Sequence, residues 1–524
     1  MKRFGILLAL CAASLTALTA APPPKPKLVV AIVIDQFRYD YLLRFRKDYN
    51  SGLARLLDQG AVYTDAHYMH SYTVTAIGHS TFLTGATPSL SGIIGNEWYD
   101  RGTQATVTSV SDPATKLLGS PKAQAGSSPR RLLVTTVGDE LKSQGGDSHV
   151  IGVSIKDRSA ILPAGHMANG AFWYDDPGHA WVSSDYYGEK LPAWVEKLNA
   201  EGPEKKFEGQ KWVPIDAKPG AEPFCTMGVK SKEGLCSSVE NTPWGNEIIE
   251  TFAEHAVTAE RLGRHNSPDI LTVSFSANDY VGHAVGPDHP AVRDMAIRTD
   301  RLLGKLFDAI ERQIGPGNML AILTADHGVG TVPEVSQSRN LPGGRFNQAP
   351  NDVKSILKSV EDALTARYGA GKWIASGTPV NLYLNRDLMA ERKLDAAEVE
   401  RTAAAVIAAA PHVARVYTRH EIAAGEVQRD PIGSAISYQF FGPRSGDVFA
   451  IQEPGFLFDA ITASHGTPYN YDTHVPVIFM GAGIKPGHYS RRIAPNDIAP
   501  TLAAILGVVE PSGSVGHVLT EIVP

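Results

Sequence analysis

The sequence predicts an α/β fold in which a central, mostly parallel sheet is flanked by helices and carries an inserted α+β cap. Three continuous apolar runs, at residues 28–34, 270–276 and 319–324, are typical of parallel strands buried on both faces. Each run leads into acidic residues, and helical patterns separate the runs along the chain. Because open α/β sheets bind ligands at the carboxyl ends of their strands, this fold class also predicts where a functional site lies.

The first 21 residues, MKRFGILLALCAASLTALTAA, have a basic start, an apolar stretch and small residues at the end, which is typical of a secretory signal peptide. An uncleaved membrane anchor is the weaker alternative, because the apolar part is shorter than the roughly 20 residues that span a bilayer. We therefore expect a periplasmic or secreted protein without a stable membrane anchor. Residues 22–27, PPPKPK, predict an extended linker, and residues 28–524 then form the main domain.

The composition is that of an ordinary globular protein, with 43% hydrophobic and 20% charged residues in a chain of 524. The formal net charge is −6 and no run of Lys or Arg occurs, which argues against nucleic acid as a structural partner. A small anionic ligand is compatible with this charge, because a site can be locally positive on an acidic protein.

Three cysteines occur, and Cys11 lies within the predicted signal peptide. The remaining pair, Cys225 and Cys236, predicts one local disulfide in an exported protein. Such a bond closes a short loop, so it braces that loop rather than holding the fold together. The alternative, a pair of metal ligands, requires further ligands nearby, and the segment between the two cysteines contains no histidine.

Helical and strand patterns alternate through the first third of the main domain. A short helix at 76–83 ends before Gly85 and Pro88, which are residue types that terminate helices. The expected elements here are helices at 51–58, 76–83 and 132–144, and strands at 61–68 and 149–155.

The segment at about 174–240 is rich in Trp, Tyr, Gly and Pro and has weak periodicity, so we expect an insertion rather than a separate domain. Helices at 246–262 and 290–313 then flank the strand at 270–276.

A second insertion, at about 335–455, breaks the alternation and predicts the α+β cap. Asp395 and Glu398 form a capping box that starts its helix. The expected cap elements are strands at 380–384, 413–417 and 448–452 and a helix at 396–410. The main domain resumes at His465, with a strand at 475–480 and a helix at 497–506.

Thr75 lies at the start of the helix predicted at 76–83. Unpaired N–H groups and the helix dipole favour negative charge there, so the Thr75 hydroxyl can become an alkoxide more easily and a phosphate can bind beside it. We therefore interpret Thr75 as a nucleophile. The alternative is that Thr75 only caps the helix.

Residues that commonly bind metals follow the predicted strands. Asp279 and His283 are four residues apart, which places both on one face of a helical turn. Mixed histidine and carboxylate ligands suit zinc better than magnesium or calcium. Taken alone, each of these residues is more often structural, but several of them follow the ends of strands in one sheet. The candidate ligands are Asp35, Asp279, His283, Asp326, His327 and His465.

Seven stretches in the same order together resemble the alkaline phosphatase superfamily. The resemblance is strongest to the secreted, phosphate-irrepressible bacterial alkaline phosphatases, which are kin of the nucleotide pyrophosphatase/phosphodiesterases. The matching stretches span nearly the whole main domain and are VVAIVIDQFRYD, TAIGHSTFLTG, SGIIGNEWYD, SIKDRSAILPAGH, SANDYVGHAVGPDHP, LTADHGVG and SHGTPYNYDTHVPVIF.

The resemblance implies an alkaline phosphatase-like fold with two Zn²⁺ ions per chain and broad-specificity hydrolysis of phosphate monoesters. Two metals can stabilise the attacking and the leaving oxygen of an in-line displacement, here through a phospho-threonine at Thr75. The partners would be small phosphorylated metabolites. By this resemblance one ion is held by Asp279, His283 and His465, and the other by Asp35, Asp326, His327 and the Thr75 oxygen.

Asn96, Lys156 and Arg158 are the expected substrate-binding residues, and the resemblance implies that they bind the non-bridging phosphate oxygens. If the strand at 149–155 continued, Lys156 and Arg158 would share a face and reach the site together. Two cations favour a monoester dianion over a diester. The alternative is that the Lys-Asp-Arg segment is only a solvated turn.

Three other functions compete with this one. A phosphodiesterase or nucleotide pyrophosphatase would use the same two-metal site. A sulfatase would need a C/S-x-P-x-R stretch, which is absent around Thr75. An inactive metal-binding protein would lack at least one ligand or the nucleophile, whereas all seven positions are filled in this sequence. Of the four further histidines near these stretches, we expect His79 to be structural, and we do not expect His166, His289 or His474 to bind metal, with His289 bordering the site as the open alternative.

Overall fold

The computed structural model describes residues 25–120, 124–458 and 460–523. The predicted signal peptide and the first three residues of the predicted linker lie outside the described residues. Among the described helices, none combines the length and the apolar character that crossing a bilayer requires.

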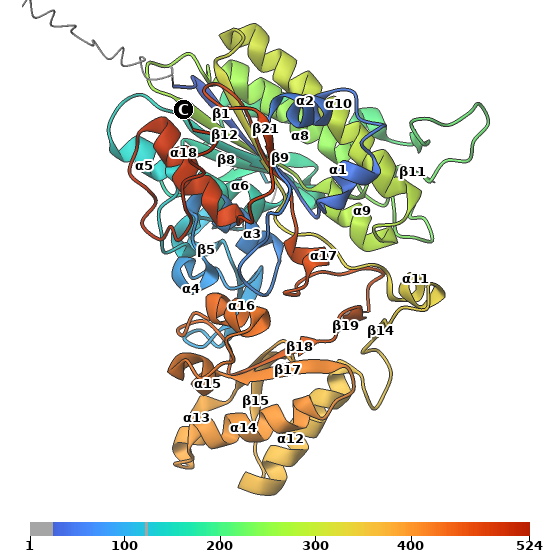
Figure 1. Cartoon of the computed structure of the whole chain (residues 1–524), viewed down its shortest axis with the longest axis vertical. Helices are drawn as coiled ribbons and strands as arrows, with labels where there is room; N and C mark the ends of the chain where they lie inside the picture. The colour runs from blue at the N-terminus through green and yellow to red at the C-terminus, as the bar shows by residue number, and fades with distance from the viewer. Residues whose placement is uncertain (1–24, 121–123, 459, 524) are drawn as a thin grey trace, which may run out of the picture.

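Within the described residues, eleven strands form one large sheet whose centre is parallel (Figure 1). β1 (Leu28–Ile34) lies between β12 (Asp269–Phe275) and β13 (Met319–Thr324) and pairs in parallel with both. The parallel part continues through β7 (Val150–Ser154) to β8 (Gly170–Asp175). The outer strands pair mostly antiparallel and are β20 (Val477–Gly481), β2 (Ala61–Tyr63) and β21 (Gly487–Tyr489) beyond β13, and β9 (Ala180–Ser184), β5 (Ser111–Leu118) and β6 (Ala125–Ser127) beyond β8.

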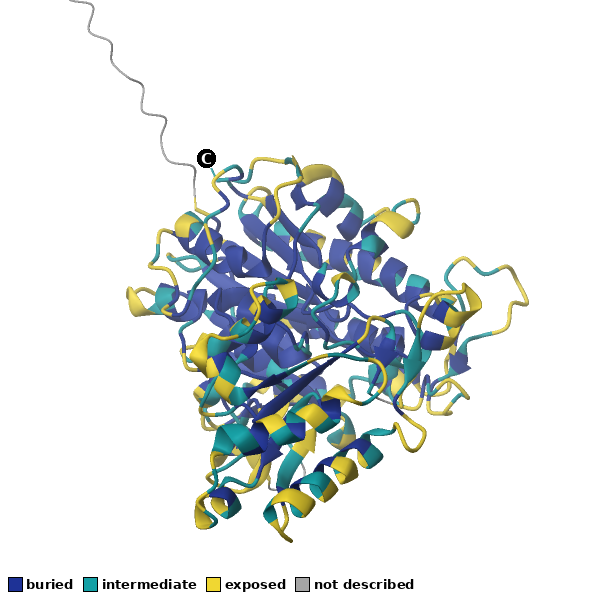
Figure 2. Cartoon of the chain, turned by 60° about the horizontal axis from the view of Figure 1, so that its bottom comes forward, coloured by how far each residue is buried: buried dark blue, intermediate teal, exposed yellow. Residues whose placement is uncertain are grey.

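Helices cover both faces of the sheet, which explains why β1 is apolar throughout. Alternate side chains of β1 enter two separate cores, with Leu28 and Val30 in the first and Val29 and Ala31 in the second. The first face is covered by α2 (Gly52–Gln59), α8 (Pro243–Ala259) and α10 (Pro290–Ile314), and the second by α3 (Thr75–Thr84), α5 (Val137–Ser143) and α18 (Ile498–Leu506). In Figure 2 the buried residues gather in this layered centre.

The cap is a smaller α+β unit below the main sheet in Figure 1. Its four strands pair antiparallel in the order β15-β16-β18-β17, and two helices pack on them around a core that includes Trp373 and Leu382. The elements are β15 (Ile374–Thr378), β16 (Asn381–Leu384), β17 (Val413–Thr418), β18 (Val448–Gln452), α12 (Val353–Tyr368) and α14 (Ala396–Ala408). The predicted α/β architecture with an inserted α+β cap is therefore confirmed.

Several local predictions change in the structure. The strand predicted at 61–68 is only three residues long, because the chain bends after Tyr63. Several elements were not predicted from the sequence: the strands β5, β6, β8, β9 and β21 join the main sheet, and a hairpin forms from β3 (Glu97–Asp100) and β4 (Ala105–Thr108). The disulfide predicted between Cys225 and Cys236 is present.

Candidate active site

The candidate ligands converge at the carboxyl ends of the three central strands. Asp35 follows β1 directly, and Asp326 and His327 follow β13. Asp279 and His283 lie on α9 (Ala277–Val285), directly after β12, as their spacing predicts. His465 arrives from the loop after the cap. Asp35 and His327, almost 300 positions apart in the chain, thus meet because parallel strands end at the same edge of the sheet.

Asp35, Asp326 and His327 form one group of potential metal ligands. Their side chains are completely buried, and His327 Nε2 lies 3.6 Å from Asp35 Oδ1 and 3.4 Å from Asp326 Oδ2. Within the described residues, these three atoms have no hydrogen-bond partner. Buried polar atoms without partners are costly, and a bound cation would satisfy all three at once. The residues therefore fit a metal ion.

A second group adjoins the first and contains Asp279, His283 and His465. His283 Nε2 lies 3.2 Å from Asp279 Oδ1, and the Nε2 atoms of His283 and His465 are 3.2 Å apart. His465 Nε2 is 3.7 Å from Asp279 Oδ1. The His327 ring stacks on the His465 ring with centroids 3.5 Å apart, so the two ligand groups are in direct contact.

Backbone carbonyls orient the imidazoles. The Nδ1 atoms donate to carbonyl oxygens: His283 to Ala463 at 2.8 Å, His327 to Gly328 at 2.9 Å and His465 to Thr73 at 2.7 Å. Because a carbonyl only accepts, Nδ1 carries the proton of each neutral ring, and the neutral ring then presents a lone pair at Nε2. Three outward-facing lone pairs beside carboxylates are the arrangement that a metal site requires.

Burial and mutual repulsion set the ionisation of these groups. Burial, with the Asp326 carboxylate beside it, raises the pKa of Asp35. Burial lowers the pKa of His327 to about 4, and it holds the pKa of His465 well below its usual range, together with the neighbouring His327 and His283. Burial also acts to lower the pKa of His283, but the Asp279 carboxylate outweighs it and raises that pKa to about 9.

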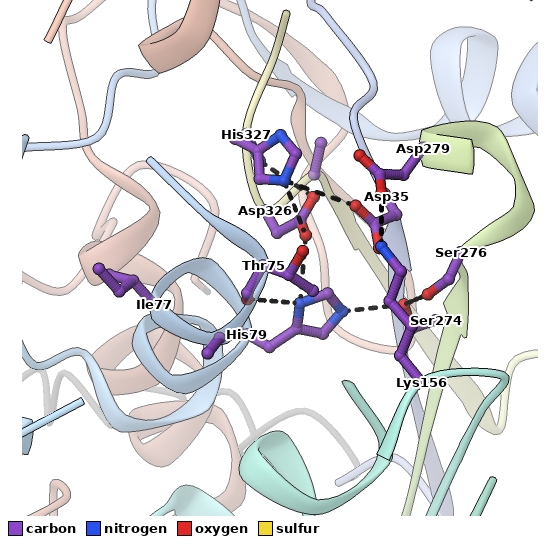
Figure 3. A network of polar contacts seen from close by, with 12 residues as sticks. Asp35, Thr75, Ile77, His79, Lys156, Ser274, Ser276, Asp279, Asp326 and His327 are labelled. Atoms are coloured by element: carbon purple, nitrogen blue, oxygen red, sulfur yellow. Dashed lines mark hydrogen bonds and ion pairs between the residues drawn. The ribbon is translucent and has the colours of Figure 1, made fainter. Parts of the chain in front are cut away.

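Thr75 is the first residue of α3 and is 2% exposed. The residue that caps this helix is Val74, so the alternative that Thr75 serves only as a cap is wrong. The helix approaches Asp326 very closely, since a Cβ atom on Gly78 would lie 2.5 Å from the Asp326 Cα. Glycine at this position therefore permits the contact between α3 and the end of β13, and Figure 3 shows Thr75 beside Asp326.

The substrate-binding candidates are separated by the local structure. β7 ends at Ser154 and α6 (Asp157–Ala164) begins directly after Lys156, so the predicted strand continuation through Arg158 is wrong. Lys156 turns inward, with Nζ 2.7 Å from Asp35 Oδ2 and 2.6 Å from Asp279 Oδ2. Arg158 stays partly exposed on the first turn of α6 and makes a weak ion pair of 3.7 Å with Asp157.

Asn96 precedes the β3–β4 hairpin and is tied to the start of α3. Its Oδ1 atom accepts a hydrogen bond of 2.8 Å from the backbone N–H of Ala76. Asn96 and Arg158 line one cavity together, whereas Lys156 is not among its lining residues. The structure thus gathers Asn96 and Arg158 at the mouth of the site and places Lys156 between the two ligand groups.

Sequence analysis missed two residues that contact the ligand groups. Gln36 donates through its backbone N–H to Asp326 Oδ1 at 3.1 Å and through Nε2 to Asp279 Oδ1 at 2.7 Å, so it holds one carboxylate of each group. His79, which we expected to be only structural, has Nδ1 2.9 Å from the Thr75 carbonyl oxygen and 3.3 Å from Asp326 Oδ2. Its four-residue spacing from Thr75 was the signal available in the sequence.

A chain of buried serines continues from His79 toward Lys156 (Figure 3). His79 Nε2 lies 2.8 Å from Ser274 Oγ, which lies 2.9 Å from Ser276 Oγ. Ser276 Oγ is 3.0 Å from Ser154 Oγ, and Ser154 accepts from the Lys156 backbone N–H at 3.2 Å. These contacts connect α3 to the end of β7.

A third cluster, Asp65, His67 and His474, also brings potential ligand atoms together. His67 already uses both ring nitrogens, with Nδ1 3.2 Å from Thr473 Oγ1 and Nε2 2.9 Å from Asp65 Oδ1. The His67 and His474 rings stack at 14° to each other with centroids 4.4 Å apart, so their lone pairs lie in two separate, nearly parallel planes and do not converge on one point. This cluster is a hydrogen-bonded packing feature, as expected for His474.

Residues 29–474 match the family model for type I phosphodiesterase / nucleotide pyrophosphatase. The chain is 37% identical to the alkaline phosphatase PhoV of Synechococcus elongatus over 95% of this chain and 93% of that protein. It is 34% identical to the alkaline phosphatase PafA of Elizabethkingia meningoseptica, with 95% of each protein covered. The crystal structure of wild-type PafA is similar with a TM-score of 0.88 at 33% identity, covering 96% of this chain and 99% of that one.

These similarities extend over the main domain and the cap, and they include the stretches that carry the candidate ligands. The prediction that the chain is an enzyme related to the alkaline phosphatases is confirmed. The chain belongs to the type I phosphodiesterase / nucleotide pyrophosphatase family.

Proposed function

We propose that the protein is a broad-specificity phosphomonoesterase that holds two zinc ions and forms a phospho-threonine at Thr75. The observation that carries this proposal is the buried group formed by Asp35 Oδ1, Asp326 Oδ2 and His327 Nε2, whose atoms have no hydrogen-bond partner within the described residues and which lies beside the start of α3. The similarity to PhoV and PafA, both named alkaline phosphatases, supports the same activity. We also propose that the protein acts in the periplasm or outside the cell, consistent with residues 1–21 and with its disulfide.

The proposed ligands are Asp279, His283 and His465 for one ion, and Asp35, Asp326, His327 and the Thr75 oxygen for the other. Bound zinc would supply Lewis acidity to the entering and leaving oxygens and lower the pKa of coordinated hydroxyl groups. Gln36 and the three backbone carbonyls hold the ligands in place before any substrate arrives.

The reaction proceeds in two displacements. Thr75 Oγ1 gives up its proton and forms a bond to phosphorus while the bond from phosphorus to the substrate's ester oxygen breaks, and the leaving alkoxide takes up a proton to become the alcohol. Water then gives up a proton and attacks the phospho-threonine, the bond to Thr75 Oγ1 breaks, Oγ1 takes up a proton, and inorganic phosphate departs. The partial positive charge at the start of α3 favours the negative charge that develops on the phosphoryl group. Asn96 and Arg158 bind its non-bridging oxygens, and Lys156 contributes a fixed positive charge from inside the site.

Thr75→Ala tests the nucleophile. We expect phosphate release from an aryl phosphate to fall by at least about a thousandfold, as when a nucleophile is removed from other covalent hydrolases, while zinc content stays unchanged. A trapped phospho-threonine in acid-quenched wild type, located at Thr75 by mass spectrometry, would support the intermediate. Activity close to wild type in Thr75→Ala would refute it.

A phosphodiesterase is the second candidate, because the matching family model is named for that activity. The two functions differ in the charge of the substrate, because a phosphate monoester is a dianion and a diester is a monoanion. Asn96 and Arg158, which bind the non-bridging oxygens, would distinguish the two. We therefore compare kcat/KM for an aryl phosphate and the matching methyl aryl diester. If the wild type prefers the monoester and Arg158→Ala reduces this preference, the phosphatase is supported. If the wild type prefers the diester, the phosphodiesterase is supported.

A further inference from the structure

A groove of about 670 Å³ runs from the proposed phosphate-binding residues toward the cap. Asn96 and Arg158 are among the residues that line it. A phosphoryl group is much smaller than this volume, and cavities of about 300–1,000 Å³ typically hold ligands the size of a metabolite or drug. The remainder of the groove is therefore available to the leaving group of a phosphate ester.

The walls of the groove come from two parts of the chain. One wall is the β3–β4 hairpin of the main domain, and the other is the β15–β16 hairpin of the cap. The rings of Tyr99 and Tyr383 meet edge to face across them, with centroids 5.5 Å apart. Arg101 reaches from the first wall to the second, with Nη1 3.1 Å from the Leu384 carbonyl oxygen and Nη2 2.5 Å from the buried Asp447. The two walls are thus held together as a preformed site.

Hydroxyl groups are concentrated on both walls. Within the described chain, the hydroxyls of Thr106 on β4 and of Ser376 and Thr378 on β15 make no hydrogen bond to another residue, although all three line the groove. Free hydroxyls on opposite walls can donate to and accept from a ligand that itself carries hydroxyls. Tyr99 adds an aromatic ring on which the apolar face of a sugar can pack.

The charges in the groove favour a neutral leaving group. Among the described lining residues, Arg158 is the single cation, and Glu97 and Asp157 contribute two carboxylates. Arg158 lies at the phosphate end, so no positive charge remains for a second phosphate further along the groove. Carboxylates repel such a group but accept hydrogen bonds from hydroxyls.

From this combination we infer that the groove is the leaving-group site and that it selects neutral, hydroxyl-rich ring alcohols, that is, the sugar of a sugar monophosphate or of a nucleoside monophosphate. This inference rests on the proposed phosphomonoesterase function and names its preferred substrate class.

The test compares two monoesters on the zinc-loaded full-length protein, in both of which a primary CH₂–O–phosphate group is attached to a six-membered ring. Glucose 6-phosphate carries ring hydroxyls, and cyclohexylmethyl phosphate carries none. We expect kcat/KM to favour glucose 6-phosphate by roughly tenfold or more, because each lost hydrogen bond weakens binding by a factor of about two to ten. Adenosine 5′-monophosphate then identifies the source of the sugar: a higher value than glucose 6-phosphate supports a nucleoside, and a lower value supports a free sugar.

Variants that remove hydroxyl groups test whether the preference for glucose 6-phosphate arises in the groove. Thr106→Val and the double variant Ser376→Ala/Thr378→Val remove groove hydroxyls, and we expect each to bring the ratio of the two kcat/KM values at least about threefold closer to one. The matched control is Thr520→Val, which alters an exposed threonine outside the groove and should leave the ratio unchanged.

Equal kcat/KM for both monoesters in wild type would overturn the inference while leaving the proposed function intact. A preference that survives in both groove variants would also overturn it, because the selecting groups would lie elsewhere. Hydrolysis of neither monoester would overturn the proposed function and the inference together.

Discussion

The Lys156 ammonium lies 2.7 Å from Asp35 Oδ2, and both side chains are almost completely removed from solvent. Lys156 makes a second contact, to Asp279 Oδ2, so one cation joins a carboxylate from each ligand group. Burial alone would lower the pKa of Lys156, but the carboxylates of Asp279 and Asp35 outweigh it and raise that pKa. Lys156 is therefore a fixed positive charge inside the site, unlike Arg158 at its mouth.

Lys156→Ala should destabilise the metal-free protein by about 3 kcal/mol, because it leaves two buried carboxylates without their cation. Urea unfolding after treatment with a chelator measures this loss. Arg158→Ala is the matched control and should cost less than about 1 kcal/mol, since its ion pair is long and partly exposed. An equal loss in the two variants would show that Lys156 does not neutralise the carboxylates.

Ser274→Ala should weaken zinc binding by about tenfold and lower kcat, because His79 loses the partner that orients it against Asp326. Competition with a chromophoric chelator measures the affinity. Ser274→Thr, which keeps the hydroxyl, should restore part of it. Ser183 is an equally buried serine that donates to the Ala171 carbonyl, and Ser183→Ala should leave zinc affinity unchanged.

Asp326→Asn should reduce the zinc content from the proposed two ions per chain to about one, because Oδ2 of Asp326 belongs to only one ligand group. Metal analysis of the purified protein by mass spectrometry measures this content. Asp65→Asn is the control, since the Asp65, His67 and His474 cluster is not built to bind a metal. A loss of zinc in Asp65→Asn would contradict that interpretation.

His70 should make the metal-free protein less stable in acid. Burial lowers the pKa of His70 to about 3, and neither ring nitrogen has a hydrogen-bond partner within the described residues. The unfolded chain, with a histidine pKa of about 6.5, therefore binds the extra proton first, and stability falls as the pH decreases from about 6.5 toward 3.

Urea unfolding of His70→Gln between pH 4 and pH 8 measures this contribution. The slope of unfolding free energy against pH below about 6.5 should decrease by up to about 1.4 kcal/mol per pH unit. His255→Gln, at an exposed position, should keep the wild-type slope. An unchanged slope in His70→Gln would mean that His70 does not titrate with folding.

Local patterns were sufficient for much of the fold. The central strands were predictable because a strand buried on both faces must be apolar throughout, and Asp279 and His283 were predictable because four-residue spacing defines one helix face. The ends of strands and the start of a helix singled out the remaining candidate ligands and Thr75, and the family resemblance supplied how the ligands divide between two ions. Sequence reasoning failed at Lys156 and Arg158, since it extended β7 by four residues past Ser154 and missed the start of α6.

The sequence by itself therefore determined the strands, the acidic residues at their ends and the presence of a cap, because these depend on periodicity and on neighbours along the chain. Only the tertiary structure decided which polar atoms meet. The His79 contact with Ser274 spans 195 positions, and the contact of Arg101 with Asp447 spans 346. Such pairs leave no local pattern, because packing of the sheet and cap brings them together and burial then makes their hydrogen bonds obligatory.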